Sequence, residues 1–356
     1  MSSNPLSYEA YAFSRAGAPS DVLKRTTFDI PADSELGDDE VDIKVMYCSL
    51  NPVGYKTMGL IPTLFIKPKP NIAESDYSGV VARVGRKVDR IAPGDFVFGG
   101  LPMAGVRHKS GGLSQRVIVS KEFVYKLKSD ARLSEASGLG IATGTSYWAL
   151  TERLNVAKGQ TVIINGASGG TGTAAVQIAR KLVGPEGTVI GICSAANSEL
   201  VKQLGANWTV DYNEKDYLSR LPTNADYVFD CIGSIKLLSH CPMFLKPEGV
   251  FFSIASDPEA RFGSIGNHIQ RIYYTTMPTF LGGIPRTCKQ ELLHLSESVI
   301  QGMGNMFSSG DIKVLIDSVY PFTDEGIIRA YDRMMSHRAK GKIIVSVQEV
   351  AKNKST

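Results

Sequence analysis

The sequence predicts an α/β protein that combines a doubly wound parallel sheet with a β-rich domain. One hydrophobic core stops growing at about 250–300 residues, and this chain has 356, so two domains are expected. Short alternating segments fill residues 1–130, whereas residues 131–299 alternate strand-like and helix-like patterns. We therefore predict one domain over residues 1–130 and another over residues 131–299.

The first domain is expected to consist of short strands. Residues 41–47 (VDIKVMY) alternate apolar and polar side chains, which is the period of a strand with one buried face. Residues 80–85, 95–99 and 111–120 have a similar character, and glycines bound them. Many short strands separated by Gly and Pro predict a compact β-rich domain.

The second domain shows repeated β-α-β patterns. Apolar, β-branched segments are followed by helical periodicity, first after residues 161–165 and again after 188–193. Further strands are predicted at residues 208–212, 226–230 and 249–254, with a helix over residues 198–204. Such repeats predict parallel strands with right-handed crossovers.

The C-terminal segment carries two helical patterns and one strand pattern. We predict helices near residues 289–303 and 324–336, and a strand over residues 342–347. The pattern leaves open whether this segment extends the parallel sheet or returns to the first domain.

Composition excludes several classes of protein. The formal net charge is +4, and because Lys and Arg are interleaved with Asp and Glu, we expect no nucleic-acid partner. We expect no membrane span, since no uncharged apolar run approaches the ~18–20 residues that a span needs. No secretory signal is apparent, and the five cysteines stand singly, as in a reducing compartment. These features predict an intracellular, cytoplasmic protein and leave association with an organelle surface open.

The strongest chemical signal is a glycine loop between a predicted strand and a predicted helix. Residues 164–172 read INGASGGTG. Glycines allow a sharp turn and a close approach of backbone N–H groups to a pyrophosphate at the helix N-terminus. An ordinary glycine-rich turn is the alternative, but the strand–loop–helix context favours a Rossmann dinucleotide site. The proposed cofactor contacts in the loop are Ser168, Gly169, Gly170, Thr171 and Gly172.

Residues after the next strand indicate which dinucleotide binds. A reader of the ribose 2′-hydroxyl would be Asp or Glu at this place, but the chain has no acid there before Glu199. Instead of an acid, this segment carries side chains that can donate hydrogen bonds or a positive charge to a 2′-phosphate, so NADPH is favoured over NADH. These residues are Ser194, Asn197, Ser198 and Lys202. The Ser and Asn residues are also ordinary caps of the following helix.

These residues resemble the medium-chain dehydrogenase/reductase superfamily, in its zinc-independent quinone-oxidoreductase-like branch, and a fungal sub-branch in particular. The resemblance rests on motifs in family order: NPVGYK (51–56), DYSGV (76–80), GDFVFG (94–99), ASGGTG (167–172) and RAKGKIIV (338–345). It implies a GroES-like substrate domain over residues 1–130, completed by 300–356, and a Rossmann domain over 131–299. It also implies that Asn51 and Lys56 face the nicotinamide. Four more residues are expected near the cofactor: Thr145, Tyr212, Gly233 and Lys342. Homodimers are possible on the same resemblance.

One position departs from the family motif. The motif reads N-P-x-D-x-K, but Gly54 stands where the aspartate is usual. A carboxylate that could orient its neighbours is therefore missing from this segment.

The sequence predicts no zinc site. A catalytic zinc takes three ligands from Cys, His or carboxylate side chains. In zinc-dependent relatives a Cys-x-x-Asp-like segment and a Gly-His-Glu segment supply the ligands. This chain has Asn51-Pro52 and Ser75-Asp76 at those places. The five histidines lack metal-ligand spacing and are interpreted as surface or hydrogen-bonded core residues.

Without a metal, hydrogen-bond donors must stabilise the negative oxygen that hydride addition creates on a small-molecule substrate. We assign this role to Tyr55 or Lys56, with Asn51 as a neutral donor. Plain packing is the alternative for Tyr55, a solvated surface position for Lys56, and a turn for Asn51-Pro52.

Three functions remain open. The first is an NADPH-dependent reductase of quinones or α,β-unsaturated carbonyls. The second is an enoyl-thioester reductase, which should need a basic groove. A solvated charged loop is the commoner explanation for the candidate groove residues, which are Lys67, Lys69, Arg107, His108 and Lys109. The third is an NADPH-binding sensor or adaptor with weak or no catalysis, which the change at Gly54 keeps open.

Overall fold

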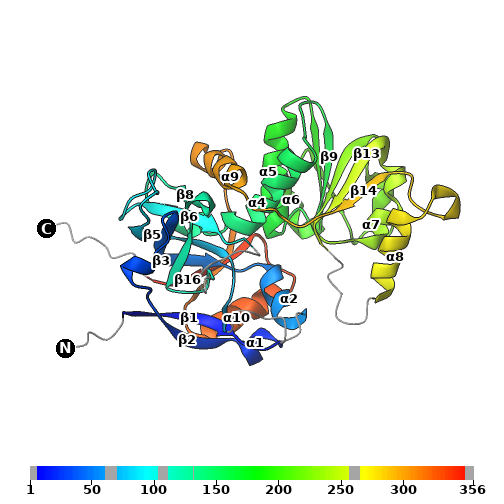
Figure 1. The fold of residues 1–356 in the computed structure, drawn as a ribbon. Coiled ribbons are helices and arrows are strands. Elements are labelled where there is room, and N and C mark those ends of the chain that lie inside the picture. Colours follow the sequence, from blue (N-terminus) through cyan, green and yellow to red (C-terminus); the bar gives the residue numbers. More distant parts are fainter. Residues whose placement is uncertain (1–5, 61–69, 103–110, 131, 256–264, 349–356) are drawn as a thin grey trace, which may run out of the picture. The chain divides into compact units, whose positions relative to one another are not determined.

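Two compact units make up the computed structural model (Figure 1). The structure describes residues 6–60, 70–102, 111–130, 132–255 and 265–348. Unit 1 combines residues 1–144 with residues 295–356, and unit 2 comprises residues 145–294.

Unit 1 is the β-rich unit and contains two sheets. The larger sheet has the order β15-β16-β3-β5-β6-β8, with β7 paired to β3, and the smaller has the order β2-β1-β4. The larger sheet is antiparallel except for the parallel pair β15–β16. Its strands are β3 (Glu40–Ser49), β5 (Asp76–Val84), β6 (Phe96–Gly100), β7 (Arg116–Ser120), β8 (Val124–Lys126), β15 (Ile316–Pro321) and β16 (Lys342–Ser346); the smaller sheet contains β1 (Ser7–Phe13), β2 (Lys24–Asp29) and β4 (Asn71–Ile72).

Short helices cover the sheets of unit 1. The longest are α9 (Glu297–Ser309) and α10 (Asp324–Met335), whose N-terminal caps are the side chains of Ser296 and Thr323. The others are α1 (Pro19–Val22), α2 (Pro52–Leu60) and α3 (Leu133–Ala136). Helix α10 packs against β15 and β16, which buries Ile327 and Tyr331 in the core.

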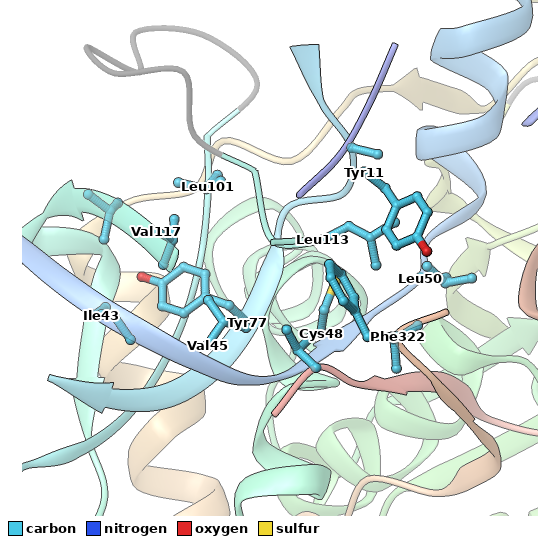
Figure 2. Close-up of a cluster of buried hydrophobic side chains, with 14 of the residues drawn as sticks. Tyr11, Ile43, Val45, Cys48, Leu50, Tyr77, Leu101, Leu113, Val117 and Phe322 are labelled. Carbon is cyan, nitrogen blue, oxygen red and sulfur yellow. The ribbon is translucent and has the colours of Figure 1, made fainter. Parts of the chain in front are cut away.

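The core of unit 1 is built from alternate residues of β3 and the elements around them (Figure 2). Val45 and Tyr77 are completely buried. The rings of Tyr11 and Phe322 meet edge to face with centroids 4.9 Å apart, so a residue near each end of the chain lies in one cluster. This unit therefore needs both the N-terminal and the C-terminal segments.

The C-terminal strand joins unit 1, which answers the question that the sequence pattern left open. Strand β16 lies between β15 and β3, with Ile344 opposite Ser49. This register brings the first residue of β16, Lys342, to the end of β3.

Unit 2 contains a six-stranded parallel sheet with the order β11-β10-β9-β12-β13-β14. In chain order this is 3-2-1-4-5-6, the Rossmann arrangement, so the predicted α/β fold class is confirmed. The strands are β9 (Thr161–Asn165), β10 (Thr188–Cys193), β11 (Trp208–Asp211), β12 (Ala225–Asp230), β13 (Leu245–Ser253) and β14 (Thr287–Gln290). The helices are α5 (Gly170–Val183), α6 (Ser198–Gln203), α7 (Ile235–Ser239) and α8 (Ile265–Thr276), and α4 (Gly144–Trp148) precedes them.

The predicted helix over residues 289–303 is wrong in its first half. Residues Thr287–Gln290 form β14, which pairs in parallel with β13, and helix α9 begins only at Glu297. The sheet edge offers β13 backbone partners to this segment, and these tertiary bonds override the helical periodicity. The true helix start is marked by Ser296, whose side chain accepts a hydrogen bond from the Val299 backbone N–H at 3.4 Å.

Within the described residues, the helices are too short or too polar to cross a membrane.

The placement of β16 inside the core gives a stability prediction. Ile343 in β16 is completely buried, whereas Val319 in the adjacent β15 is 52% exposed. Ile343→Ala should lower the free energy of unfolding by about 2–4 kcal/mol because it leaves a cavity. The matched control Val319→Ala should change it by about 0.5 kcal/mol or less. Urea denaturation measures both values, and equal losses would contradict the placement.

Candidate cofactor cradle and catalytic cluster

The glycine loop of unit 2 allows α5 to begin directly above the end of β9. Gly166 has a φ of 78°, a left-handed conformation that favours glycine. A Cβ on Gly172 would lie 2.7 Å from the Cα of Ala167, so any side chain there would push the helix away from the loop. The sequence of this loop therefore permits a backbone approach that other residues would block.

The N-terminus of α5 is suited to an anion. Gly169 is its N-cap, no side chain among the described residues caps it, and its first turn carries no acid. Backbone N–H groups at a helix start, together with the helix dipole, attract phosphate. Ser168 and Thr171 are half-buried, so their hydroxyls lie at the rim of this cradle. The cradle fits a pyrophosphate.

Helix α4 supports the loop from the N-terminal side. The Ser146 hydroxyl donates a hydrogen bond to the Thr171 carbonyl oxygen at 2.8 Å. Thr145, a predicted cofactor residue, is buried one position before Ser146.

The structure brings one residue after β10 to the glycine loop. The Asn197 amide nitrogen donates to the Ser168 hydroxyl at 3.1 Å, and the Asn197 Oδ1 is buried without a partner among the described residues. The Ser198 hydroxyl is bonded to that of Thr209 at 2.5 Å. Ser194 is half-buried and Lys202 is exposed. This edge of the cradle therefore presents hydroxyl, amide and ammonium groups.

A buried aspartate holds the opposite edge, and the sequence reasoning missed it. Asp230 ends β12 beside Asn165, which ends β9, at the point where the strand order reverses. Its Oδ1 accepts from the Asn165 amide at 2.8 Å and from the backbone N–H of Gly233 at 3.0 Å. Ligands of doubly wound sheets bind at this switch point. The sequence signal for Asp230 is an acid at the end of an apolar strand, followed three residues later by Gly233.

The remaining predicted cofactor residues of unit 2 differ in exposure. Gly233 is buried with a φ of 94°, and its carbonyl oxygen accepts from the Arg271 guanidinium at 2.8 Å. Tyr212 follows β11 and is 54% exposed.

Unit 1 contains a buried polar cluster around Asn51. The Asn51 Oδ1 accepts from Lys342 Nζ at 2.7 Å, and its Nδ2 donates to Asp76 Oδ2 at 2.9 Å. Lys342 Nζ also donates to the Leu50 carbonyl oxygen at 3.0 Å and lies 3.3 Å from Asp76 Oδ2. An ammonium group has three N–H donors, and groups of unit 1 accept from all three donors of Lys342. Lys342 is the predicted cofactor residue that lies in unit 1.

Asp76 is fully satisfied within the cluster. It is completely buried and accepts further hydrogen bonds from the Ser49 hydroxyl and the Ile141 backbone N–H, each at 2.7 Å. A buried charge is tolerated when it is paired and hydrogen-bonded. The cluster therefore fixes the side chain of Asn51 in one orientation.

A second buried carboxyl group, Glu74, lies beside Asn51. Its Oε2 accepts from the Asn51 backbone N–H at 3.0 Å, and its Oε1 accepts from the Tyr331 hydroxyl at 2.7 Å. Burial raises the pKa of Glu74 from 4.5 to about 7, against the lowering effect of these hydrogen bonds. No local pattern marks this residue, because its partner Tyr331 is 257 positions away.

Tyr55 and Lys56 lie on α2, directly after Asn51. Both are half-buried, and Tyr55 packs against the core of unit 1. Burial raises the pKa of Tyr55 above its ordinary value, so its hydroxyl keeps its proton at neutral pH and remains a donor.

Within the described residues, no three His, Cys, Asp or Glu side chains are grouped so that they could hold a metal ion. The basic residues considered for a carrier groove lie outside the described residues; they are Lys67, Lys69, Arg107, His108 and Lys109.

Two protein families match this chain. The alcohol dehydrogenase GroES-like domain matches residues 37–129, and the family described as zinc-binding dehydrogenase matches residues 204–345. A zinc-type alcohol dehydrogenase-like protein of Schizosaccharomyces pombe is 34% identical over 344 residues, which cover 94% of this chain and 95% of that protein. A trans-enoyl reductase of Aspergillus terreus is 30% identical over 326 residues, which cover 88% of each chain. The solved quinone oxidoreductase from Coxiella burnetii shares the fold, with a TM-score of 0.77 at 24% identity, and the match covers 96% of this chain and 100% of that one.

The raised pKa of Glu74 predicts how pH affects stability. The folded protein holds the Glu74 proton up to about pH 7, whereas the unfolded chain releases it near 4.5. Ionisation therefore opposes folding, and the stabilisation present below pH 4.5 is lost as the pH rises towards 7. The free energy of unfolding of the natural protein minus that of Glu74→Gln should fall between about pH 5 and about pH 7. Urea denaturation across this range gives the difference, and a flat or rising difference would contradict the assignment.

Proposed function

The chain belongs to the medium-chain dehydrogenase/reductase superfamily, in its quinone-oxidoreductase-like part, and on that premise we propose that it is a zinc-independent, NADPH-dependent reductase of quinones or α,β-unsaturated carbonyls. That it is an oxidoreductase follows from the reductases among its relatives. The coenzyme, the acceptor and the independence from zinc are the proposed parts.

The N-terminus of α5, which no side chain in the described part of the chain caps, carries this proposal. It offers backbone N–H groups to a pyrophosphate at the switch point of a Rossmann sheet. A bound nicotinamide dinucleotide supplies the hydride that the reaction needs. The chain contributes Ser168, Gly169, Gly170 and Thr171 to the phosphates, and Asp230 holds the neighbouring loop at Gly233.

The edge after β10 supports NADPH as the coenzyme. A carboxylate there would repel a 2′-phosphate, whereas Ser194 and Asn197 offer hydrogen-bond donors and Lys202 adds a positive charge. We include Ser198 and the exposed Tyr212 in the same subsite.

Catalysis then depends on donors from the segment 51–56. Hydride addition to a conjugated acceptor leaves an enolate or hydroquinone anion, whose oxygen must be stabilised. The protonated hydroxyl of Tyr55 and the ammonium group of Lys56 are the proposed donors. The Asn51 amide nitrogen has two N–H donors, and Asp76 takes one of them. Since Asp76 and Lys342 hold this amide in place, Asn51 needs little reorganisation when substrate binds.

The donor set argues for chemistry without zinc. Asn51 and Ser75, which stand where zinc-dependent relatives have ligands, are not usual zinc ligands. A metal bound at Asp76 Oδ2 would displace the contacts of this oxygen with Ser49, Asn51 and Lys342. Hydrogen-bond donors are therefore proposed to replace the Lewis acid.

Enoyl thioesters are a second candidate class of acceptor. The observation that favours them is the name trans-enoyl reductase among the relatives that match most of the chain. Quinones, enones and enoyl thioesters share an alkene conjugated to a carbonyl group, so the same donors would serve all three.

We propose further that the protein acts in a reducing compartment such as the cytoplasm. All five cysteines are free thiols, and three of them are buried. Free thiols persist where glutathione and thioredoxin keep them reduced. A homodimer is part of this proposal on family resemblance alone.

A coenzyme-exchange variant tests the assignment of the 2′-phosphate subsite. The natural protein should oxidise NADPH with at least one quinone, enone or enoyl thioester. Ser194→Asp should lower the ratio of kcat/KM for NADPH to that for NADH by about tenfold or more, because a carboxylate repels the 2′-phosphate. Absorbance at the dihydronicotinamide band measures both rates. An unchanged ratio would contradict the subsite, and no turnover across the panel would favour the sensor or adaptor reading.

Removal of the proposed donors tests the catalytic assignment. Tyr55→Phe or Lys56→Ala should lower kcat by about 100-fold, the usual loss when one oxyanion donor is removed. The KM for NADPH should stay the same, because the proposed contacts with its phosphates lie in unit 2 and include neither Tyr55 nor Lys56. Natural turnover in both variants would show that neither side chain stabilises the anion.

A further inference from the structure

Gly54 lies against the carboxyl group of Glu74. A Cβ built on Gly54 would be 2.7 Å from Glu74 Cδ, which is closer than real side-chain atoms approach. The space that an aspartate side chain of the N-P-x-D-x-K motif would begin to fill is therefore occupied by another carboxyl group. The absence of a side chain at Gly54 therefore leaves room for the Glu74 carboxyl group.

The position of Glu74 requires an unfavourable backbone conformation and the burial of an ionisable group. Its φ of 61° is left-handed, which is unusual for a residue with a long side chain. Its carboxyl group is also buried, with only 8% of the residue exposed. A glycine at this position would adopt the same φ without that strain. Residues that keep both backbone strain and a buried acid are candidates for a functional role.

The Glu74 carboxyl group connects α10 to the segment that carries the proposed catalytic residues. Tyr331 of α10 donates to one oxygen at 2.7 Å, and the Asn51 backbone N–H donates to the other at 3.0 Å. Asn51 lies directly before α2, and its carbonyl oxygen accepts from the Gly54 backbone N–H at 2.9 Å. Glu74 thus fixes the backbone at the start of α2, while Lys342 and Asp76 fix the Asn51 side chain.

We propose that Glu74 is a positioning residue that replaces the motif aspartate: its carboxyl group, in the space that Gly54 leaves, holds Asn51 and the start of α2. This inference rests on the proposed function for its kinetic part only. A carboxyl group returned to position 54 should then take over the role when Glu74 is removed.

Three variants separate the carboxyl group from the space that it fills. Glu74→Gly removes the carboxyl group and the backbone strain together. The double variant Glu74→Gly with Gly54→Asp places a carboxyl group on residue 54 instead. The matched control, Glu74→Gly with Gly54→Ala, adds a methyl group at residue 54 but no carboxyl group. The readouts are kcat and KM for NADPH oxidation, and amide hydrogen exchange of the peptide that contains residues 50–54, which needs no turnover.

Glu74→Gly is expected to lower kcat by about tenfold, because the Asn51 backbone N–H and the Tyr331 hydroxyl lose their buried acceptor, with the KM for NADPH unchanged. Exchange of the segment 50–54 should be faster. The variant with Gly54→Asp should return kcat to within about threefold of the natural protein and slow the exchange again, whereas the variant with Gly54→Ala should do neither.

Equal kcat and equal exchange in the Asp and Ala variants would overturn the proposal, as would natural kcat and exchange in Glu74→Gly. If the natural protein oxidises no NADPH, the proposed function fails, and the exchange of the segment 50–54 alone decides the role of Glu74.

Discussion

The close approach of α5 to the end of β9 is the constraint on which the cofactor cradle depends. The turn at Gly166 and the absence of a side chain at Gly172 bring the first N–H groups of the helix to the edge of the sheet. Every other feature of the cradle is arranged around that edge: Ser146 supports the loop from α4, Asn197 bonds to Ser168, and Asp230 fixes the opposite loop. The arrangement leaves backbone donors and small polar side chains to meet an anion.

Charge burial governs unit 1 in a similar way. One lysine, Lys342, meets one carboxylate, Asp76, and their remaining hydrogen-bonding capacity is taken up by Asn51 and neighbouring groups. Burial raises the pKa of the second acid, Glu74, to about 7. Below that pH Glu74 is neutral, and the charges of Lys342 and Asp76 cancel. The cluster joins β3, β5, α10 and β16, so the C-terminal segment helps to set the geometry at Asn51.

The parts of the fold that local sequence specifies were predictable. The β-branched segments at β9 and β10 were predicted with their observed bounds, and the glycine loop identified the helix that follows β9. Strand β14 was missed because its partner β13 decides its structure, and no periodicity reports that pairing. Asn51 and Lys342 were singled out by resemblance, but their contact was not foreseen. Glu74 could not be found, because its bond to Tyr331 spans 257 positions and only the folded chain brings them together.

The most direct test is an equilibrium titration of the purified protein with NADPH and with NADH, followed by quenching of protein fluorescence in the presence of a zinc chelator. NADPH should bind saturably, with a dissociation constant about tenfold or more below that of NADH. Absence of saturable binding of both reduced coenzymes, with the chelator and with added zinc, would contradict a dinucleotide site at the start of α5.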